Sequence, residues 1–163
     1  MSGTVPPELI PPTAGQAALV ASWSTSAEEA AQWCSVAEHP FDPANVRDWW
    51  EEPDVQPWLL LDGDRPVAYG EIWTDEEGEA ELARVLVDPE VRGRGVARRL
   101  VTLLVGLARS AGIPECFVRV VPENLPALAA YRAAGFVDVD EALAAEWNVL
   151  QPTEYVWLRH AGG

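Results

Sequence analysis

Residues 85–97 read Val-Leu-Val-Asp-Pro-Glu-Val-Arg-Gly-Arg-Gly-Val-Ala. The apolar start of this stretch is typical of a buried strand, and it leads into a loop in which arginine and glycine alternate. From Gly95 onward, apolar residues recur with a helical period. The first N–H groups of a helix have no partner within it and carry the positive end of its dipole. A strand, a loop and a helix N-terminus in this order therefore predict an anion site.

The side chains of the loop favour phosphate as the anion. Gly93 and Gly95 let the backbone approach a ligand closely, and Ala97 keeps the first helical turn open. Four arginines supply forked donors that suit phosphate oxygens: Arg92, Arg94, Arg98 and Arg99. A dinucleotide fingerprint does not fit, because Arg98 stands where its third glycine would be. A pyrophosphate-bearing ligand of another kind is our interpretation, and a solvated arginine-rich turn is the alternative.

The distribution of charge also indicates a local anionic ligand. The chain has a net charge of -15, yet residues 91–132 carry a net charge of +5. Nucleic acid is excluded as a partner, because its phosphates need a broad basic footprint. All 11 basic residues are arginines, so P-loop, Schiff-base and pyridoxal phosphate sites, which need a lysine, are excluded too.

Length and composition predict one domain. The 163 residues are 48% hydrophobic, enough for a single core. We expect residues 1–15, which include four prolines, to be an irregular lead-in and residues 16–163 to form the domain. The longest apolar stretch, Leu100–Ala108, is too short to span a membrane, and the N-terminus has no signal-peptide pattern. No association with a membrane is expected.

The cysteines and histidines indicate the compartment and the absence of metal. Cys34 and Cys116 form no C-x-x-C pair, so we expect no disulfide framework and a cytoplasmic location. His39 and His160 have no partners at metal-ligand spacing, and no metal is expected.

Outward from the loop, the pattern predicts two early helices, an antiparallel meander and then alternating helices and strands. The expected elements are a strand at 18–23, helices after Ser26 and Asp42, strands at 58–61, 67–73 and 79–87, a helix from Gly95 to Gly112, a strand at 116–121, a helix from Asn124 to Gly135, and strands at 136–139 and 154–158. Strand alternation predicts one shared face for Glu79, Glu81, Ala83, Val85 and Val87. The last strand is expected at an exposed sheet edge, which would allow a homodimer.

A second signature follows the loop. Residues 124–136 read Asn-Leu-Pro-Ala-Leu-Ala-Ala-Tyr-Arg-Ala-Ala-Gly-Phe. They match N-x-x-A-x-x-x-Y-x-x-x-G-F, and Arg92, Gly95 and Ala97 match R/Q-x-x-G-x-G/A. With both signatures in this order, the chain resembles the GNAT superfamily of N-acetyltransferases. The resemblance covers residues 58–140 well, and the first 57 residues match only in having two helices near the start.

The resemblance implies an α/β fold of the α+β, mixed-sheet kind: a GNAT-type acyl-CoA N-acyltransferase fold in which the central strands 79–87 and 116–121 splay apart. It implies acetyl-CoA as co-substrate. The backbone of Val85, Leu86 and Val87 would contact its pantetheine arm, and Asn124 would lie near the far side of the cofactor. The pyrophosphate would be held by Arg92, Gly93, Arg94, Gly95, Val96, Ala97 and Arg98.

Acetyl transfer from a thioester to an amine needs a neutral amine, a polarised carbonyl and a proton for the leaving thiolate. By the resemblance, Tyr131 is the acid, and a tyrosine that only packs in the core is the alternative. Glu81 stands where histone-type members carry their catalytic glutamate, and we favour it as the base. Glu79, Glu71 and Glu123 are the alternatives.

The resemblance predicts an N-acetyltransferase that moves the acetyl group of acetyl-CoA to a primary amine by direct attack in a ternary complex. The acidic chain favours a small cationic metabolite or antibiotic as acceptor. We expect Trp49 or Trp50, in the early helices, to line the acceptor site. Two alternatives stay open: a non-catalytic acyl-CoA-binding or regulatory module, and an enzyme that acetylates protein N-termini.

Overall fold

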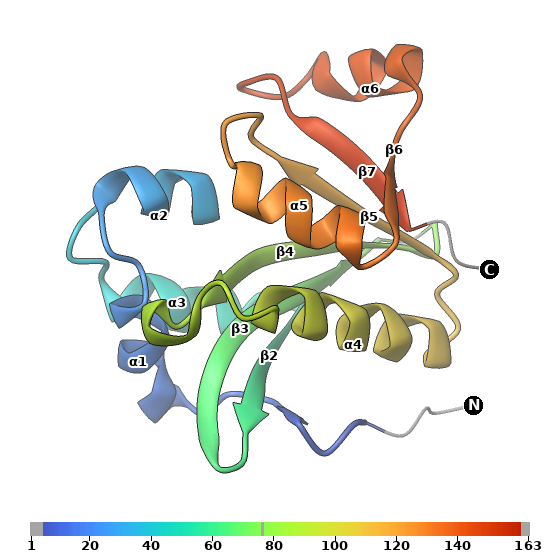
Figure 1. Ribbon diagram of the computed structural model, residues 1–163. Helices are drawn as coiled ribbons and strands as arrows, with labels where there is room; N and C mark the ends of the chain where they lie inside the picture. The colour runs from blue at the N-terminus through green and yellow to red at the C-terminus, as the bar shows by residue number, and fades with distance from the viewer. Residues whose placement is uncertain (1–4, 76, 161–163) are drawn as a thin grey trace.

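The structure is a computed structural model, and it describes residues 5–75 and 77–160. A mixed sheet of seven strands, in the order β1-β2-β3-β4-β5-β7-β6, carries helices on both faces (Figure 1). The strands are β1 Leu9–Ile10, β2 Val55–Asp62, β3 Arg65–Thr74, β4 Glu79–Val87, β5 Glu115–Val120, β6 Phe136–Asp138 and β7 Val156–His160. The helices are α1 Ala17–Ser22, α2 Ala27–Cys34, α3 Pro43–Trp50, α4 Val96–Ser110, α5 Leu125–Ala133 and α6 Glu141–Asn148, with short 3-10 turns at Ala14–Gln16 and Pro89–Val91.

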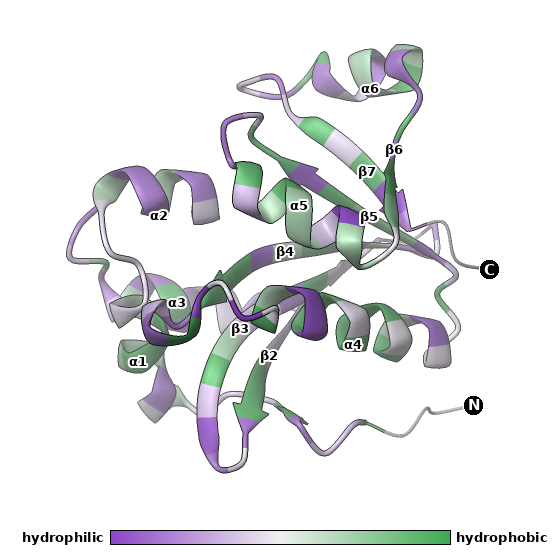
Figure 2. Ribbon diagram, in the orientation of Figure 1, coloured by the Kyte–Doolittle hydropathy of each residue, from purple (hydrophilic) through white to green (hydrophobic). Residues whose placement is uncertain are grey.

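The alternation of side chains along β2 and β3 divides the core into two layers. Leu60 and Ala68 point into a cluster under α4 and α5, whereas their neighbours Leu59 and Tyr69 point into a cluster under α1–α3. Figure 2 shows the corresponding hydropathy, with hydrophobic colour along β2 and hydrophilic colour at the β2–β3 turn and over much of α2. Each face of the sheet therefore has its own apolar cover.

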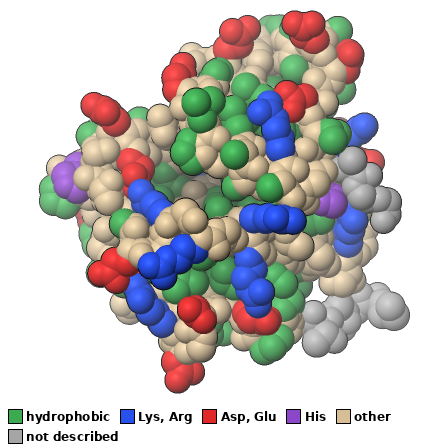
Figure 3. All heavy atoms as spheres, viewed as in Figure 1, with side chains coloured by type: hydrophobic (Ala, Val, Ile, Leu, Met, Phe, Trp, Pro, Cys, Tyr) green, Lys and Arg blue, Asp and Glu red, His purple; other side chains and the backbone are tan. Residues whose placement is uncertain are grey.

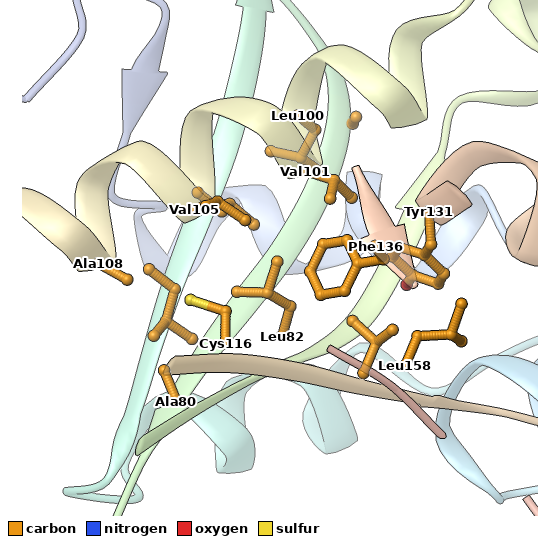
Figure 4. Packing of buried hydrophobic residues seen from close by; sticks show 14 of the residues in the cluster. Ala80, Leu82, Leu100, Val101, Val105, Ala108, Cys116, Tyr131, Phe136 and Leu158 are labelled. Carbon is orange, nitrogen blue, oxygen red and sulfur yellow. The ribbon is translucent and has the colours of Figure 1, made fainter. Parts of the chain in front are cut away.

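The predicted helix after the arginine–glycine loop is confirmed as α4. It begins after Gly95 and buries one stripe against the sheet: Leu100, Val101, Leu104, Val105 and Ala108. Figure 4 shows these side chains facing β4 and β5, with Tyr131 and Phe136 at the far end of the same cluster. The stripe fixes where the helix N-terminus lies relative to the central strands.

The predicted separation of the two central strands is confirmed. β4 pairs with β5 in parallel only where Glu79, Ala80 and Glu81 face residues 115–117. Beyond this point β5 continues its pairing with β7 on its other side. The second half of β4 therefore turns an unpaired edge toward β5.

One prediction about β4 is wrong, because a β-bulge interrupts its alternation. Arg84 has a φ of 49°, in the left-handed region, and the register between β3 and β4 shifts opposite Gly70. Before the bulge, Glu81 lies on the face opposite the α4 cluster; after it, Val85 and Val87 pack against that cluster while Leu86 joins the other. Glu79, Glu81 and Ala83 therefore do not share a face with Val85 and Val87.

Other elements also differ from the prediction. Residues 18–23 are not a strand, since 17–22 form α1, and the helix α6 was not predicted. The strand expected at 154–158 runs from 156 to 160 and lies between β5 and β6, so it is not an exposed edge and gives no support for a homodimer. Residues 9–10, inside the expected irregular lead-in, form β1. Across the described residues, every helix is too short or too polar to cross a membrane.

Candidate active site

A cavity of about 890 Å³ opens where β4 and β5 separate. Its walls come from α2, β4, the arginine–glycine loop, the start of α4, and α5. Every predicted site residue except Arg94 lines it: Glu81, Val85, Leu86, Val87, Arg92, Gly93, Gly95, Val96, Ala97, Arg98, Asn124 and Tyr131. The fold therefore gathers both sequence signatures at one cavity.

The mouth of the cavity at α4 can hold an anion. Gly93 and Gly95 have φ values of 78° and 77°, which glycine adopts without strain. Gly95 caps α4 without a side-chain hydrogen bond, so the N–H groups of the first turn stay free for a ligand. The Arg98 guanidinium has no ion pair or hydrogen bond to a described residue. Figure 3 shows arginine side chains gathered below the hollow of this face.

Arg92 has a different task from the one expected of its side chain. Its guanidinium donates to both carboxylate oxygens of Glu29 at 2.8 Å, to the carbonyl oxygen of Trp23 at 2.9 Å and to that of Val87 at 3.0 Å. These bonds tie the loop to α2 and to the end of β4. Arg92 shapes the cavity wall, whereas Arg98 lines the cavity without a side-chain partner among the described residues.

Tyr131 extends from α5 into the core and reaches the cavity with its hydroxyl end. The ring is 8% exposed and packs edge-on against Phe136, with 5.8 Å between centroids. Its hydroxyl forms no hydrogen bond with a described residue, although it is not sealed from the cavity. Burial, and then the charge of Glu81, raise the pKa of Tyr131. The phenol therefore keeps its proton at neutral pH.

Glu81 lies on the cavity wall beside a cation from the neighbouring strand. Its Oε2 pairs with Nε of Arg119 at 2.9 Å. Burial raises the pKa of Glu81, while the charge and hydrogen bond of Arg119 lower it, and the net shift is upward. A carboxylate with a raised pKa is a stronger proton acceptor than an ordinary one.

The alternative bases lie in different surroundings. Glu71 is fully buried and accepts hydrogen bonds from Tyr69, Trp73 and Arg84, so its oxygens are occupied. Glu123 lines the large cavity, and Glu79 lines a smaller cavity on the opposite face. These positions favour Glu81, which lines both cavities.

Several residues of the site escaped the sequence reasoning. Arg119 lines the cavity and donates to Oε1 of Gln151 at 2.7 Å, and Trp33 and Trp73 also line it. Trp49 and Trp50, expected at the acceptor site, line neither cavity: Trp49 packs in the core, and Nε1 of Trp50 donates to the Tyr69 hydroxyl. No motif marks these positions, because strand pairing brings distant segments together.

The chain is similar to a known protein family over most of its length. Residues 21–136 match the model of the Acetyltransferase (GNAT) family. The chain belongs to the GNAT family. A mycothiol acetyltransferase of Clavibacter michiganensis is 33% identical over 128 residues, covering 71% of this chain and 42% of the relative. One from Corynebacterium glutamicum is 28% identical over 130 residues, covering 77% and 44%. The chain thus spans less than half the length of these curated relatives.

Solved structures share the GNAT fold. The aminoglycoside acetyltransferase AAC(6')-Ib, in complex with paromomycin and acetyl-CoA, has a TM-score of 0.73 at 17% identity, covering 93% of this chain and 91% of that one. A domain from Methanocaldococcus jannaschii has a TM-score of 0.73 at 13% identity, covering 93% and 95%. At these identities the likeness concerns the fold alone.

The ion pair between Glu29 and Arg92 of the arginine–glycine loop predicts how the stability of the fold depends on pH. Replacing Glu29 with glutamine should lower the free energy of unfolding by up to about 1 kcal/mol at neutral pH, since the ion pair is partly exposed. Burial would raise the pKa of Glu29, but hydrogen bonds from Arg92 and Thr25 and the charge of Arg92 together lower it below 4.5. A lowered pKa means that the pair stabilises the fold above pH 4.5 and that this contribution is lost as the pH falls through the folded-state pKa.

Urea denaturation of both proteins at neutral pH and in acid measures this effect, and the difference should shrink in acid. Glu28→Gln is the matched control, because Glu28 lies in the same helical turn and its side chain has no hydrogen bond or ion pair with a described residue. An equal loss in Glu28→Gln, or a difference that persists in acid, would contradict the assignment.

Proposed function

We propose that this chain transfers the acetyl group of acetyl-CoA to the primary amine of a small molecule. One observation carries the proposal: the free N-terminus of α4, the Glu81 carboxylate and the Tyr131 hydroxyl all open into the cavity between β4 and β5. Membership of the GNAT family and relatives named as acetyltransferases support the same reaction. The relatives named for mycothiol and for aminoglycosides support a small-molecule acceptor.

Acetyl-CoA, when bound, supplies the acetyl group as a thioester. The cavity fits such a ligand, because it joins an anion-binding helix end to an apolar gap with unpaired strand backbone. The first turn of α4 and Arg98 would bind the diphosphate, with Arg94 nearby on the same loop. The free edge of β4 after the bulge would orient the pantetheine arm, and Asn124, the cap of α5, would lie beside it.

Two side chains would move protons in this reaction. Glu81 would take a proton from the ammonium form of the acceptor, directly or through a water, because an alkyl ammonium is charged at neutral pH. Tyr131 would hold a proton for the departing sulfur, which its raised pKa keeps in place. Arg119 would keep the Glu81 carboxylate oriented through their ion pair.

The test is release of free thiol from acetyl-CoA in the presence of a panel of small amines and of short peptides with free N-termini. We expect amine-dependent release with small amines. An Arg98→Ala variant should need on the order of tenfold more acetyl-CoA, as expected for losing a charge-assisted hydrogen bond. Arg99→Ala is the matched control, since Arg99 pairs with Glu8 instead. Tight binding of acetyl-CoA without release by any amine would indicate a non-catalytic module and overturn the proposal.

A further inference from the structure

A second cavity, of about 400 Å³, lies on the face of the sheet opposite α4. Residues from the α3–β2 connection, the β3–β4 turn, β5, α6 and β7 line it. It shares the lining residues Trp73 and Glu81 with the large cavity, so Glu81 lies at the boundary between the two. A molecule that occupies this second cavity therefore contacts Glu81, the base of the proposed reaction.

The walls of the second cavity combine aromatic rings with carboxylates. Trp147 packs edge-on against Phe117 and Trp157, with centroid distances of 5.2 and 5.1 Å, and Trp73 completes the aromatic part. The acidic lining residues are Glu52, Asp54, Asp75, Glu79 and Glu81, and none of the described lining residues is basic. Aromatic faces and carboxylates are the groups that bind an alkyl ammonium.

The carboxylates of the second cavity differ in whether a cation neutralises them. Glu81 is paired with Arg119, whereas the side chains of Glu52, Asp54 and Glu79 have no hydrogen bond or ion pair with a described residue. Carboxylate oxygens of Asp75, Glu77 and Glu79 lie within 4.8 Å of one another. Burial and these like charges raise the pKa of Glu79. A cation in the cavity would relieve this repulsion, beyond what a single amine at Glu81 can do.

The spacing of two carboxylates along β4 indicates how far apart the amines of the acceptor would lie. Glu79 and Glu81 lie two residues apart on one face before the bulge, which corresponds to roughly 7 Å along a strand. Resting on the proposed function, we infer that the acceptor is an aliphatic diamine or polyamine, whose reacting amine lies at Glu81 while a second ammonium lies in this cavity. The aromatic rings would cover the methylene chain between them.

The test compares binding of diaminobutane and diaminopentane with that of butylamine and pentylamine, by calorimetry on the full chain without acetyl donor. Each diamine should bind on the order of tenfold more tightly than its monoamine, and added salt should reduce this preference. In the double variant Glu52→Gln/Asp54→Asn the preference should fall to within about threefold. The control is Asp62→Asn/Asp64→Asn, which removes the same charge at the other end of the β2 strand, in the exposed β2–β3 turn, and should keep the preference.

Two results would overturn the inference: equal affinity for diamines and monoamines, or equal loss in both double variants, which would reflect only the overall charge. If Glu52→Gln/Asp54→Asn does not fold, Glu79→Gln provides the same comparison inside the cavity. The thiol-release assay separates this inference from the proposed function. Equal thiol release with diamines and monoamines would support acetyl transfer but contradict the diamine as the preferred acceptor. No thiol release together with tighter binding of diamines would support the assignment of the second cavity but contradict acetyl transfer.

Discussion

Replacing Tyr131 with phenylalanine should lower kcat by about 10²- to 10⁴-fold, the usual contribution of a positioned general acid. The acetyl-CoA concentration for half-saturation should change by less than about threefold, because such a variant loses proton transfer and not ground-state binding. The ring keeps its contact with Phe136, and the hydroxyl has no hydrogen bond to lose among the described residues. The melting temperature should therefore stay close to that of the original chain. Steady-state kinetics with a saturating amine measure the effect.

The pH profile tests whether Tyr131 stays protonated, and a matched tyrosine variant separates catalysis by Tyr131 from simple packing. Since burial raises the pKa of Tyr131, the phenol stays protonated through the alkaline range, and kcat should show no loss there from its ionisation. Tyr155→Phe is the comparison, because Tyr155 also lines the large cavity and its ring centroid lies 5.4 Å from the Arg119 guanidinium. We expect kcat of this variant to fall by less than about tenfold, because no proton transfer is assigned to Tyr155. A Tyr131→Phe variant that retains most of its kcat would make Tyr131 a core residue and leave the acid unassigned.

Local sequence determined the parts of the fold that surround the arginine–glycine loop. β4 has the predicted bounds, and α4 and α5 begin at their predicted caps, Gly95 and Asn124. In these segments the apolar period, the glycines and the caps all favour the same structure, so tertiary contacts did not need to override them. The short apolar run at 18–23 is different, because a run of that length fits a buried helix as well as a strand.

The site itself depends on contacts that no local pattern shows. Arg84 is not a residue that signals a left-handed bulge, yet the bulge decides which side chains of β4 face α4. Arg119 and Trp73 reach Glu81 only because β3, β4 and β5 are neighbours in the sheet. The sequence motifs predicted the proposed cofactor site, whereas the proposed acceptor side, built from five separate segments, needed the structure.

Arg84, the residue of the bulge, forms an ion pair with a fully buried carboxylate. Oε1 of Glu71, which is fully buried, accepts from Arg84 at 3.0 Å and from Nε1 of Trp73 at 2.7 Å, and Oε2 accepts from the Tyr69 hydroxyl. The Arg84 guanidinium lies over the ring of Trp49, at 4.1 Å. Burial raises the pKa of Glu71, but the three donors and the charge of Arg84 oppose that shift and suit the carboxylate form.

Replacing Glu71 with glutamine should therefore lower the free energy of unfolding by about 2 kcal/mol, because the variant leaves the partly buried Arg84 charge without its partner. Glutamine nearly preserves the shape, but its amide nitrogen only donates. With the amide oxygen kept toward Trp73 and Arg84, the nitrogen takes the place of Oε2, and the proton of the Tyr69 hydroxyl loses its acceptor. Urea denaturation measures the loss. Asp138→Asn makes the same chemical change in the exposed pair with Arg132 and should cost far less stability.

The double variant Glu71→Leu/Arg84→Leu tests whether the ion pair is needed to form the bulge in β4 and, through it, to bind acetyl-CoA. Removing both charges avoids an unpaired one, so the double variant should be more stable than Glu71→Leu alone. It also removes the tie that holds residue 84 in its left-handed conformation beside the cavity, although Nε1 of Trp33 still donates to the carbonyl oxygen of this residue. If the ion pair shapes the edge of β4, the double variant should recover stability but bind acetyl-CoA more weakly. Recovery of both would show that the bulge forms without the ion pair and that Trp33 and the surrounding strands suffice to hold it.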